Sequence, residues 1–240
     1  MSLNTLEEIA AFIVSNGKGI LAADESNPTC GKRFDSIGVE SSEANRRDYR
    51  EMLFRSSGMK ENIGGVILFD ETIRQDAKDG TSLVQVIRDQ GALPGIKVDQ
   101  GLKPLDSSPE ETLTQGLEGL HHRCSEYFQL GAKFTKWRAV IKIDGALPTS
   151  DCIESNMQAL AEYAKIVQDN NMVPMVEPEV LMDGDHSIDR CYEVSSAALK
   201  SLFAVNGIQC SLRELGILNL FSELIVALIF FVNLILNFIN

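Results

Sequence analysis

Five short apolar runs, each with glycine or proline at its entrance, constrain the fold of this chain more than any other feature. The runs are rich in β-branched residues and bounded by turn residues, which suits strands buried on both faces of a parallel sheet. Their starts lie about 30 to 45 residues apart, the spacing expected of repeated βα units. The predicted strands are 19–23, 65–69, 95–98, 132–137 and 173–176.

The segments between these runs carry helix signals. Ser108-Pro109-Glu110-Glu111 has the form of a capping box with proline at the first helical position, and it predicts a helix starting there. Helices are also predicted over 45–56 and 188–202. Over 151–170, apolar residues recur at steps of three and four and predict one buried stripe on a helix; they are Ile153, Met157, Leu160, Ala164 and Val167.

Repeated strand–helix units fit either a doubly wound sheet or part of a (β/α)8 barrel. A glycine fingerprint of the GxGxxG type does not follow the first strand. Charged residues instead lie on or just after four of the five strands, as in barrel enzymes, whose sites form at the carboxyl ends of the strands. The sequence therefore predicts an α/β fold of the (β/α)8 TIM-barrel family, here an incomplete barrel with about five βα units. The charged residues are Asp24, Lys97, Asp99, Lys136, Arg138, Glu177 and Glu179.

Residues two apart on a strand share a face, so these charges can form a cationic rim with carboxylates beside it. Such a rim suits an anionic, phosphorylated metabolite, with carboxylates available to move protons. The alternative is that the charges are structural ion pairs filling the end of the sheet. A second phosphate site is predicted at 26–33, where small residues, Lys32 and Arg33 precede a helix-like stretch.

The overall charge and the cysteine pattern exclude several classes of protein. The 240 residues carry a formal net charge of −12, which argues against nucleic-acid binding. The five cysteines are spread singly, which favours reduced thiols in a cytoplasmic setting over disulfides or a zinc site. The N-terminal segment lacks the pattern of a secretory or transit signal. Trp137, His121, His122, His186 and the cysteines are interpreted as packing or solvated residues, and no metal site is predicted.

Six motifs resemble those of class I fructose-bisphosphate aldolases, in that family's order and spacing, over roughly residues 16–202. The resemblance implies a (β/α)8 barrel that reversibly cleaves fructose 1,6-bisphosphate to glycerone phosphate and glyceraldehyde 3-phosphate, without metal or cofactor. It also implies an iminium between a lysine and the substrate ketone, which accepts the electrons of the broken C–C bond. The motifs are Gly17–Ser26, Gly64–Thr72, Gly95–Asp99, Lys136–Arg138, Val176–Glu179 and Asp183–His186.

The resemblance also implies residue roles. Asp24 would handle the hydroxyl proton at the bond being cleaved, and Glu177 would act as the acid/base that dehydrates the carbinolamine. Lys136 would place positive charge beside the Schiff-base amine, and Glu179 would fix the neighbouring lysines. The remaining predicted contacts are with substrate oxygens or phosphates: Ser26, Lys32, Arg33, Lys97 and Arg138.

The sequence departs from the family after Leu202. The family's Schiff-base lysine lies in a sixth-strand motif resembling Leu-Lys-Pro-Asn-Met, and this sequence has no lysine after Lys200. Residues 215–240 contain 19 hydrophobic residues and one charge, Glu223. We therefore expect a partial barrel over 1–202 and an unrelated apolar tail over 203–240.

The tail has two interpretations. Leu224–Asn240 is 17 residues without a charge and could serve as a membrane anchor, although it is shorter than the roughly 20 residues that span a bilayer. Non-native coding is the favoured interpretation. Two functional hypotheses follow: an aldolase whose nucleophile is absent from these residues, so that this chain is inactive by itself, or an inactive aldolase-like fragment with a binding or membrane-attached role. Homotetramers are usual in the family, but unpaired strand edges argue against one here.

Overall fold

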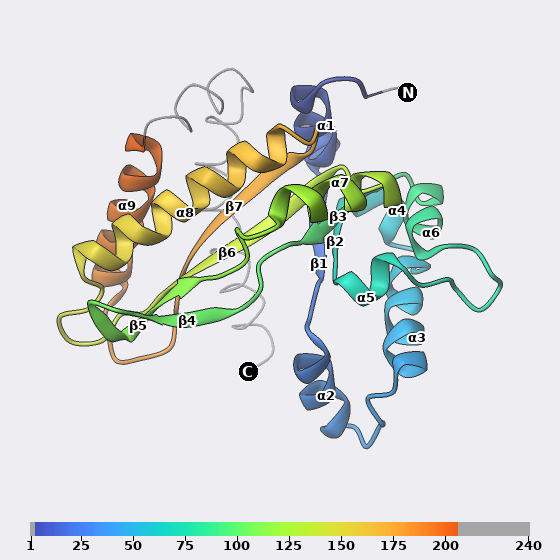
Figure 1. The fold of residues 1–240 in the computed structure, drawn as a ribbon. Helices are drawn as coiled ribbons and strands as arrows, with labels where there is room; N and C mark the ends of the chain where they lie inside the picture. The colour runs from blue at the N-terminus through green and yellow to red at the C-terminus, as the bar shows by residue number, and fades with distance from the viewer. Residues whose placement is uncertain (1–2, 206–240) are drawn as a thin grey trace. The chain divides into compact units, whose positions relative to one another are not determined.

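The structure, a computed structural model, describes residues 3–205 in two compact units (Figure 1). The first unit contains the described residues up to Gly101 together with Gln115–Trp137 and Ile166–Val176. The second contains Leu102–Thr114, Arg138–Lys165 and the described residues from Glu177 onward. The expectations for 206–240, including the membrane anchor, lie outside the described residues, and the division into 1–202 and 203–240 stays a prediction.

The main sheet has five strands in the order β1-β2-β3-β6-β7, which is also their order along the chain. The pairs β1–β2, β2–β3 and β3–β6 are parallel. A doubly wound sheet reverses its strand order at a switch point, and this sheet does not, so an incomplete (β/α)8 barrel is confirmed. The strands are β1 (Gly19–Ala23), β2 (Ile63–Leu68), β3 (Leu93–Lys97), β6 (Phe134–Ile141) and β7 (Val173–Val180).

All five predicted strands form, and two of them run past their predicted ends. β6 and β7 end at Ile141 and Val180, so Arg138, Glu177 and Glu179 lie inside strands. Buried and half-exposed residues alternate from Thr135 onward in β6 and from Pro174 onward in β7, as expected when one face of a strand packs on helices.

Glycines in the strands of the first unit make room for close packing. The ring of Phe134 lies over β2 and β3, and a Cβ atom at Gly95 would come within 2.4 Å of it. A Cβ at Gly64 would come within 1.9 Å of the carbonyl oxygen of Ile13, where the first helix packs on β2. Glycine is therefore required at both positions by the neighbouring atoms.

Four helices of the first unit begin with a side-chain cap. The side chain of Thr5 caps α1 in a capping box with Glu8, and Ser26, Ser42 and Ser82 cap α2, α3 and α6. Helix α3 packs against α6, which packs against β3 (Figure 1). The helices are α1 (Leu6–Ile13), α2 (Asn27–Asp35), α3 (Glu43–Phe54), α4 (Met59–Asn62), α5 (Asp70–Ile73), α6 (Leu83–Asp89) and α7 (Leu120–Leu130), with a 3-10 turn at Ser15–Gly17.

The second unit corrects one prediction. The capping-box segment at Ser108 is a strand, β5 (Ser108–Thr114), which pairs antiparallel with β4 (Leu102–Leu105). The local signal fails because Glu111 serves a distant helix: its carboxylate accepts hydrogen bonds from the backbone N–H and the hydroxyl of Thr149, at 2.9 and 2.6 Å. Thr149 in turn accepts from the N–H of Cys152 at the start of α8 (Ser150–Gln168). Tertiary contacts thus override the local helix signal.

The two long helices that were predicted near the end of the match are present. In α8, four of the five stripe residues are buried, and Ile153 is half-exposed. The predicted helix 188–202 is α9 (Ile188–Ala204), capped by Ser187. Over residues 3–205, no helix combines the length and the apolar character needed to cross a bilayer.

Candidate active site

Asp24, Lys97 and Lys136 come together in the first unit and are called here the aspartate–lysine cluster. Asp24 directly follows β1, Lys97 ends β3, and Lys136 on β6 is the register partner of Lys97. An Asp24 carboxylate oxygen lies 3.6 Å from the Lys136 ammonium and 4.0 Å from that of Lys97. The three side chains are 12 to 20% exposed. Parallel register therefore gathers one anion and one cation at the carboxyl ends of β1 and β3, next to a second cation near the start of β6.

This arrangement has a definite chemical capacity. One carboxylate and two ammonium groups lie close together in a partly desolvated setting, where Coulomb attraction between a cation and an anion is stronger than in water. The carboxylate can accept a proton from a bound hydroxyl, and the lysines can donate hydrogen bonds to substrate oxygens.

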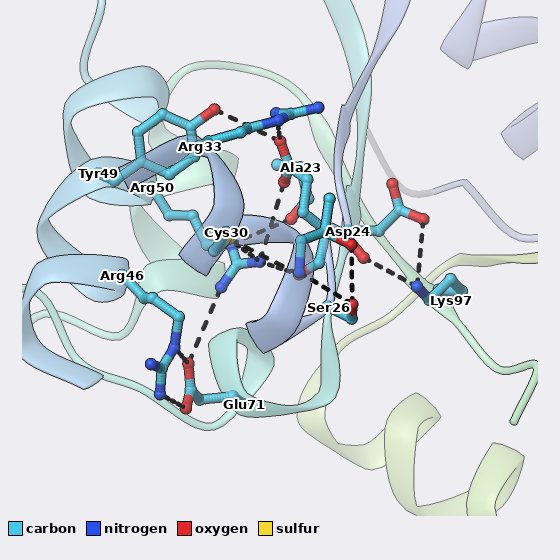
Figure 2. Close-up of polar contacts among 12 residues, drawn as sticks. Ala23, Asp24, Ser26, Cys30, Arg33, Arg46, Tyr49, Arg50, Glu71 and Lys97 are labelled. Carbon is cyan, nitrogen blue, oxygen red and sulfur yellow. Dashed lines mark hydrogen bonds and ion pairs between the residues drawn. The ribbon is translucent and has the colours of Figure 1, made fainter. Parts of the chain in front are cut away.

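The backbone around Asp24 is held by cations as well (Figure 2). Lys97 Nζ donates to the carbonyl oxygen of Asp24 at 3.0 Å. The guanidinium of Arg50 donates to the carbonyls on either side, from Nε to Ala23 at 3.2 Å and from Nη2 to Glu25 at 2.5 Å. Arg50 is on α3 and is fully buried.

A second arginine and a glutamate extend this network. Arg46 forms a two-pronged pair with Glu71, with distances of 2.8 and 2.6 Å, and Arg50 Nη1 lies 3.9 Å from Glu71 Oε1. The hydrogen bonds from Arg46 lower the pKa of Glu71 against the opposing effect of burial. The sequence analysis missed this network. The available signal was the step of four along α3 that aligns Arg46 and Arg50 with buried Phe54.

The predicted phosphate site at 26–33 differs from expectation in its local structure. Ser26 is the N-cap of α2, and its hydroxyl accepts from the N–H of Thr29 at 3.4 Å. Lys32 and Arg33 lie in the last turn of that helix, not before a helix. Lys32 is exposed, and Arg33 is paired with Glu25. The helix begins earlier than predicted because Pro28, in the first turn after the Ser26 cap, favours a helix start there.

In the second unit, Arg138 and Glu179 form an ion pair, called here the arginine–glutamate pair. Arg138 Nη1 lies 3.3 Å from Glu179 Oε2, and the side chains are 42 and 35% exposed. Glu177 is two residues from Glu179 on β7 and shares its half-exposed face. Glu179 was expected to fix lysines, and the ion pair observed for it is with an arginine.

The residues assigned to packing or solvent behave as expected where the structure describes them. Trp137 is fully buried, and His121 and His122 are exposed on α7. Cys30, Cys124 and Cys152 are buried, and burial raises the pKa of the Cys124 thiol to about 11 and that of Cys152 to about 12.

Two further features were tested as candidate sites. Within residues 3–205, no three His, Cys, Asp or Glu side chains are grouped as a metal site requires. A cavity of about 480 Å³ in the first unit contains none of the predicted site residues; its lining is Glu43, Ala44, Arg47, Arg74, Gln75 and Asp76.

Comparison with known proteins gives a consistent result. A family model described as glycolytic, fructose-bisphosphate aldolase class-I, matches residues 5–212. A probable fructose-bisphosphate aldolase class 1 of Xanthomonas campestris pv. campestris is 53% identical over 203 residues, covering 85% of this chain and 61% of that protein. The cytoplasmic isozyme of fructose-bisphosphate aldolase from spinach (Spinacia oleracea) is 51% identical over 194 residues, covering 81% of this chain and 54% of that protein.

The structural comparison agrees. The aldolase of Plasmodium falciparum, solved in complex with TRAP and a small-molecule inhibitor, superposes with a TM-score of 0.81 at 46% identity, over 82% of this chain and 58% of that one. The chain thus spans between 54 and 61% of the length of these three relatives. On the family match and these identities, the chain belongs to the class I fructose-bisphosphate aldolase family.

Proposed function

We propose that this chain carries the part of a class I aldolase active site that binds fructose 1,6-bisphosphate and moves its protons. The observation that carries the proposal is the aspartate–lysine cluster, with Asp24 within 4.0 Å of both Lys97 and Lys136. Family membership supplies the reaction: reversible cleavage to glycerone phosphate and glyceraldehyde 3-phosphate.

The chemistry assigns Asp24 the central proton transfer. In the family reaction a lysine amine condenses with the substrate ketone, releases water, and leaves an iminium. When Asp24 accepts the proton of the hydroxyl on the second carbon from the iminium carbon, the bond between that carbon and the intervening one breaks. The electron pair of this bond enters the iminium to form an enamine, and the carbon that carried the hydroxyl leaves as an aldehyde. Lys136 and Lys97 place positive charge beside Asp24 and stabilise the charge that develops in the reaction.

The other predicted residues take supporting roles. We assign the dehydration of the carbinolamine to Glu177. We propose that Glu179 orients Arg138 toward a substrate oxygen. Ser26, Lys32 and Arg33 are assigned to one phosphate, and Arg33 would exchange its carboxylate partner Glu25 for that phosphate. A guanidinium pairs with either group in the same two-pronged geometry, so this exchange is chemically balanced.

The imine-forming lysine is the missing component. These 240 residues contain no lysine in the family's sixth-strand motif, so we propose that they do not form the imine by themselves. The cytoplasm is proposed as the location, and an assembly of several copies is left to experiment.

Borohydride trapping tests the proposal. The 240-residue chain is incubated with fructose 1,6-bisphosphate, treated with sodium borohydride, and examined by intact mass and peptide mapping. We expect no reduced adduct. In a parallel assay of lysine acetylation by peptide mapping, we expect bound substrate to slow the acetylation of Lys97 and Lys136. An adduct on either lysine would overturn the proposal that the nucleophile is absent. Absence of any protection would favour a fragment with a different binding role.

A further inference from the structure

Three consecutive carbonyl groups at the end of β1 each accept a hydrogen bond from a cationic side chain. They belong to Ala23, Asp24 and Glu25, and the donors are Arg50, Lys97 and again Arg50 (Figure 2). The ladder between β1 and β2 ends at the Ala23–Leu68 pair, so the next two residues have passed beyond strand pairing. Side chains therefore fix the segment that carries Asp24, in place of a neighbouring strand.

Arg50 is the donor that spans Asp24. Its guanidinium bonds the carbonyls immediately before and after Asp24, which restrains the peptide on each side of that residue's Cα. Because the fork of an arginine is planar and rigid, one side chain sets both positions at once. Lysine carries its three donors on one nitrogen at the end of a flexible stem, so it does not hold two carbonyls in a fixed relative geometry.

The surroundings of Arg50 hold it firmly. The side chain is 0% exposed, and carboxylate oxygens of Glu25 and Glu71 lie 3.9 Å from its two terminal nitrogens. Nη2 also lies 3.6 Å from the sulfur of Cys30. A buried cation with two carboxylates nearby is compensated without being drawn away from the carbonyls.

One aromatic ring links the two cations. Lys97 Nζ lies 5.4 Å from the centroid of the Phe69 ring, and Arg50 Cζ lies 5.9 Å from the same centroid. Both distances allow a cation–π attraction. Phe69 directly precedes α5, whose second residue is Glu71, so the ring and the carboxylate that serve Arg50 come from adjacent positions of the chain.

We propose that Arg50 is a positioning residue for Asp24, which holds the carboxylate within reach of Lys97 and Lys136 by clamping the carbonyls on either side of it. The proposal rests on the proposed function for the statement that Asp24 takes part in catalysis. A reacting group displaced by about 1 Å loses on the order of a hundredfold in rate, so such a clamp has direct consequences for the reaction.

The test measures the reactivity of the two lysines of the aspartate–lysine cluster and does not require catalytic turnover. Acetylation rates of individual lysines are measured by peptide mass spectrometry in the unsubstituted chain and in Arg50→Gln, Arg50→Lys and Arg46→Gln. Lys133 is half-exposed, and its Nζ lies 5.0 Å from the centroid of the Phe128 ring. Its acetylation rate reports general loosening of the first unit. Arg46→Gln is the matched control, because it breaks the pair with Glu71 and leaves the Ala23 and Glu25 carbonyls bonded.

We expect Arg50→Gln to raise the rates at Lys97 and Lys136 about fivefold, the factor that corresponds to one lost hydrogen bond, with no change at Lys133. Arg50→Lys should give an intermediate rise, because a lysine keeps the buried charge but lacks the planar fork that fixes both carbonyls. If Arg50→Gln does not fold, Arg50→Lys, which keeps the buried charge, supplies the comparison with Arg46→Gln.

Unchanged rates at Lys97 and Lys136 would overturn the proposal. It would also fail if Lys133 rose equally, which would make Arg50 a purely structural residue, or if Arg46→Gln had the same effect. Protection of Lys97 and Lys136 by fructose 1,6-bisphosphate in the unsubstituted chain is scored separately. Loss of that protection alone would remove the proposed function and leave the clamp intact.

Discussion

The aspartate–lysine cluster and the arginine–glutamate pair both place charges on strands, but they differ in how those charges are supported. Asp24, Lys97 and Lys136 are at most 20% exposed, and arginine and lysine side chains hold the backbone beneath Asp24. Arg138 and Glu179 face each other at 3.3 Å while 42 and 35% exposed. The first site is held rigidly by its surroundings, and the second is free to change partners.

This difference indicates where substitutions will matter. Breaking a buried ion pair leaves an uncompensated charge and costs about 3 to 5 kcal/mol, whereas exposed pairs contribute about 0 to 1 kcal/mol. We therefore expect stability to depend on the groups behind Asp24 and to be nearly insensitive to the arginine–glutamate pair.

The largest effect is expected for Arg50→Gln. Two carbonyls lose their donor, and the carboxylates of Glu25 and Glu71 lose a buried cation, so the free energy of unfolding should fall by about 3 to 5 kcal/mol. Urea denaturation followed by circular dichroism measures it. Arg55→Gln, on a half-exposed arginine just after the same helix, is the control and should change stability by less than about 1 kcal/mol. Equal effects of the two substitutions would contradict the comparison.

Glu71→Gln should have the next largest effect and should depend on pH. Arg46 lowers the pKa of Glu71 in the fold, so this carboxylate stabilises the protein above its unfolded pKa of about 4.3. The contribution is lost as the pH falls through the folded value. We expect Glu71→Gln to cost about 2 kcal/mol at pH 7.

The difference between the two proteins should shrink below about pH 4. Urea midpoints at pH 7 and pH 3 check this, with exposed Glu61→Gln as the control. A difference that stays constant across this range would mean that Arg46 does not stabilise the charged form of Glu71.

Glu111→Gln tests whether the loss of stability depends on how deeply a charged side chain is buried or on which unit contains it. Glu111 is in the second unit, like Glu179, but is only 2% exposed and bonded twice to Thr149. Burial acts to raise its pKa, and the hydrogen bonds from Thr149 outweigh that effect and leave it lowered. We expect a loss of about 1 to 2 kcal/mol at neutral pH, because Thr149, just before α8, loses one of its two acceptor oxygens and faces an NH2 donor instead. Glu110→Gln, exposed and adjacent, should be nearly neutral.

Glu111 also shows how far the sequence predicts this structure. The parallel strands were predictable because apolar runs at βα spacing are local signals, and the charges at their ends followed from alternation along each strand. The hairpin of β4 and β5 was not predictable, because Ser108-Pro109-Glu110-Glu111 carries a helix signal whose glutamate bonds to Thr149, 38 residues away. Arg50 was missed for the same reason: its partners lie 25 and 27 residues earlier in the chain.

Glu179→Gln should give the smallest effect. With both side chains more than one-third exposed, the pair with Arg138 is screened by water and salt, so we expect a change in unfolding free energy within about 0.5 kcal/mol. A double-mutant cycle with Arg138→Gln measures the coupling directly, and repeating it in 1 M NaCl should remove what coupling there is, because the Debye length falls to about 3 Å. A coupling above about 1.5 kcal/mol that persists in salt would mean that the pair is as firmly held as the aspartate–lysine cluster. In that case Glu179 would fix Arg138 before substrate arrives, and the proposed orientation of Arg138 toward a substrate oxygen would be set in advance.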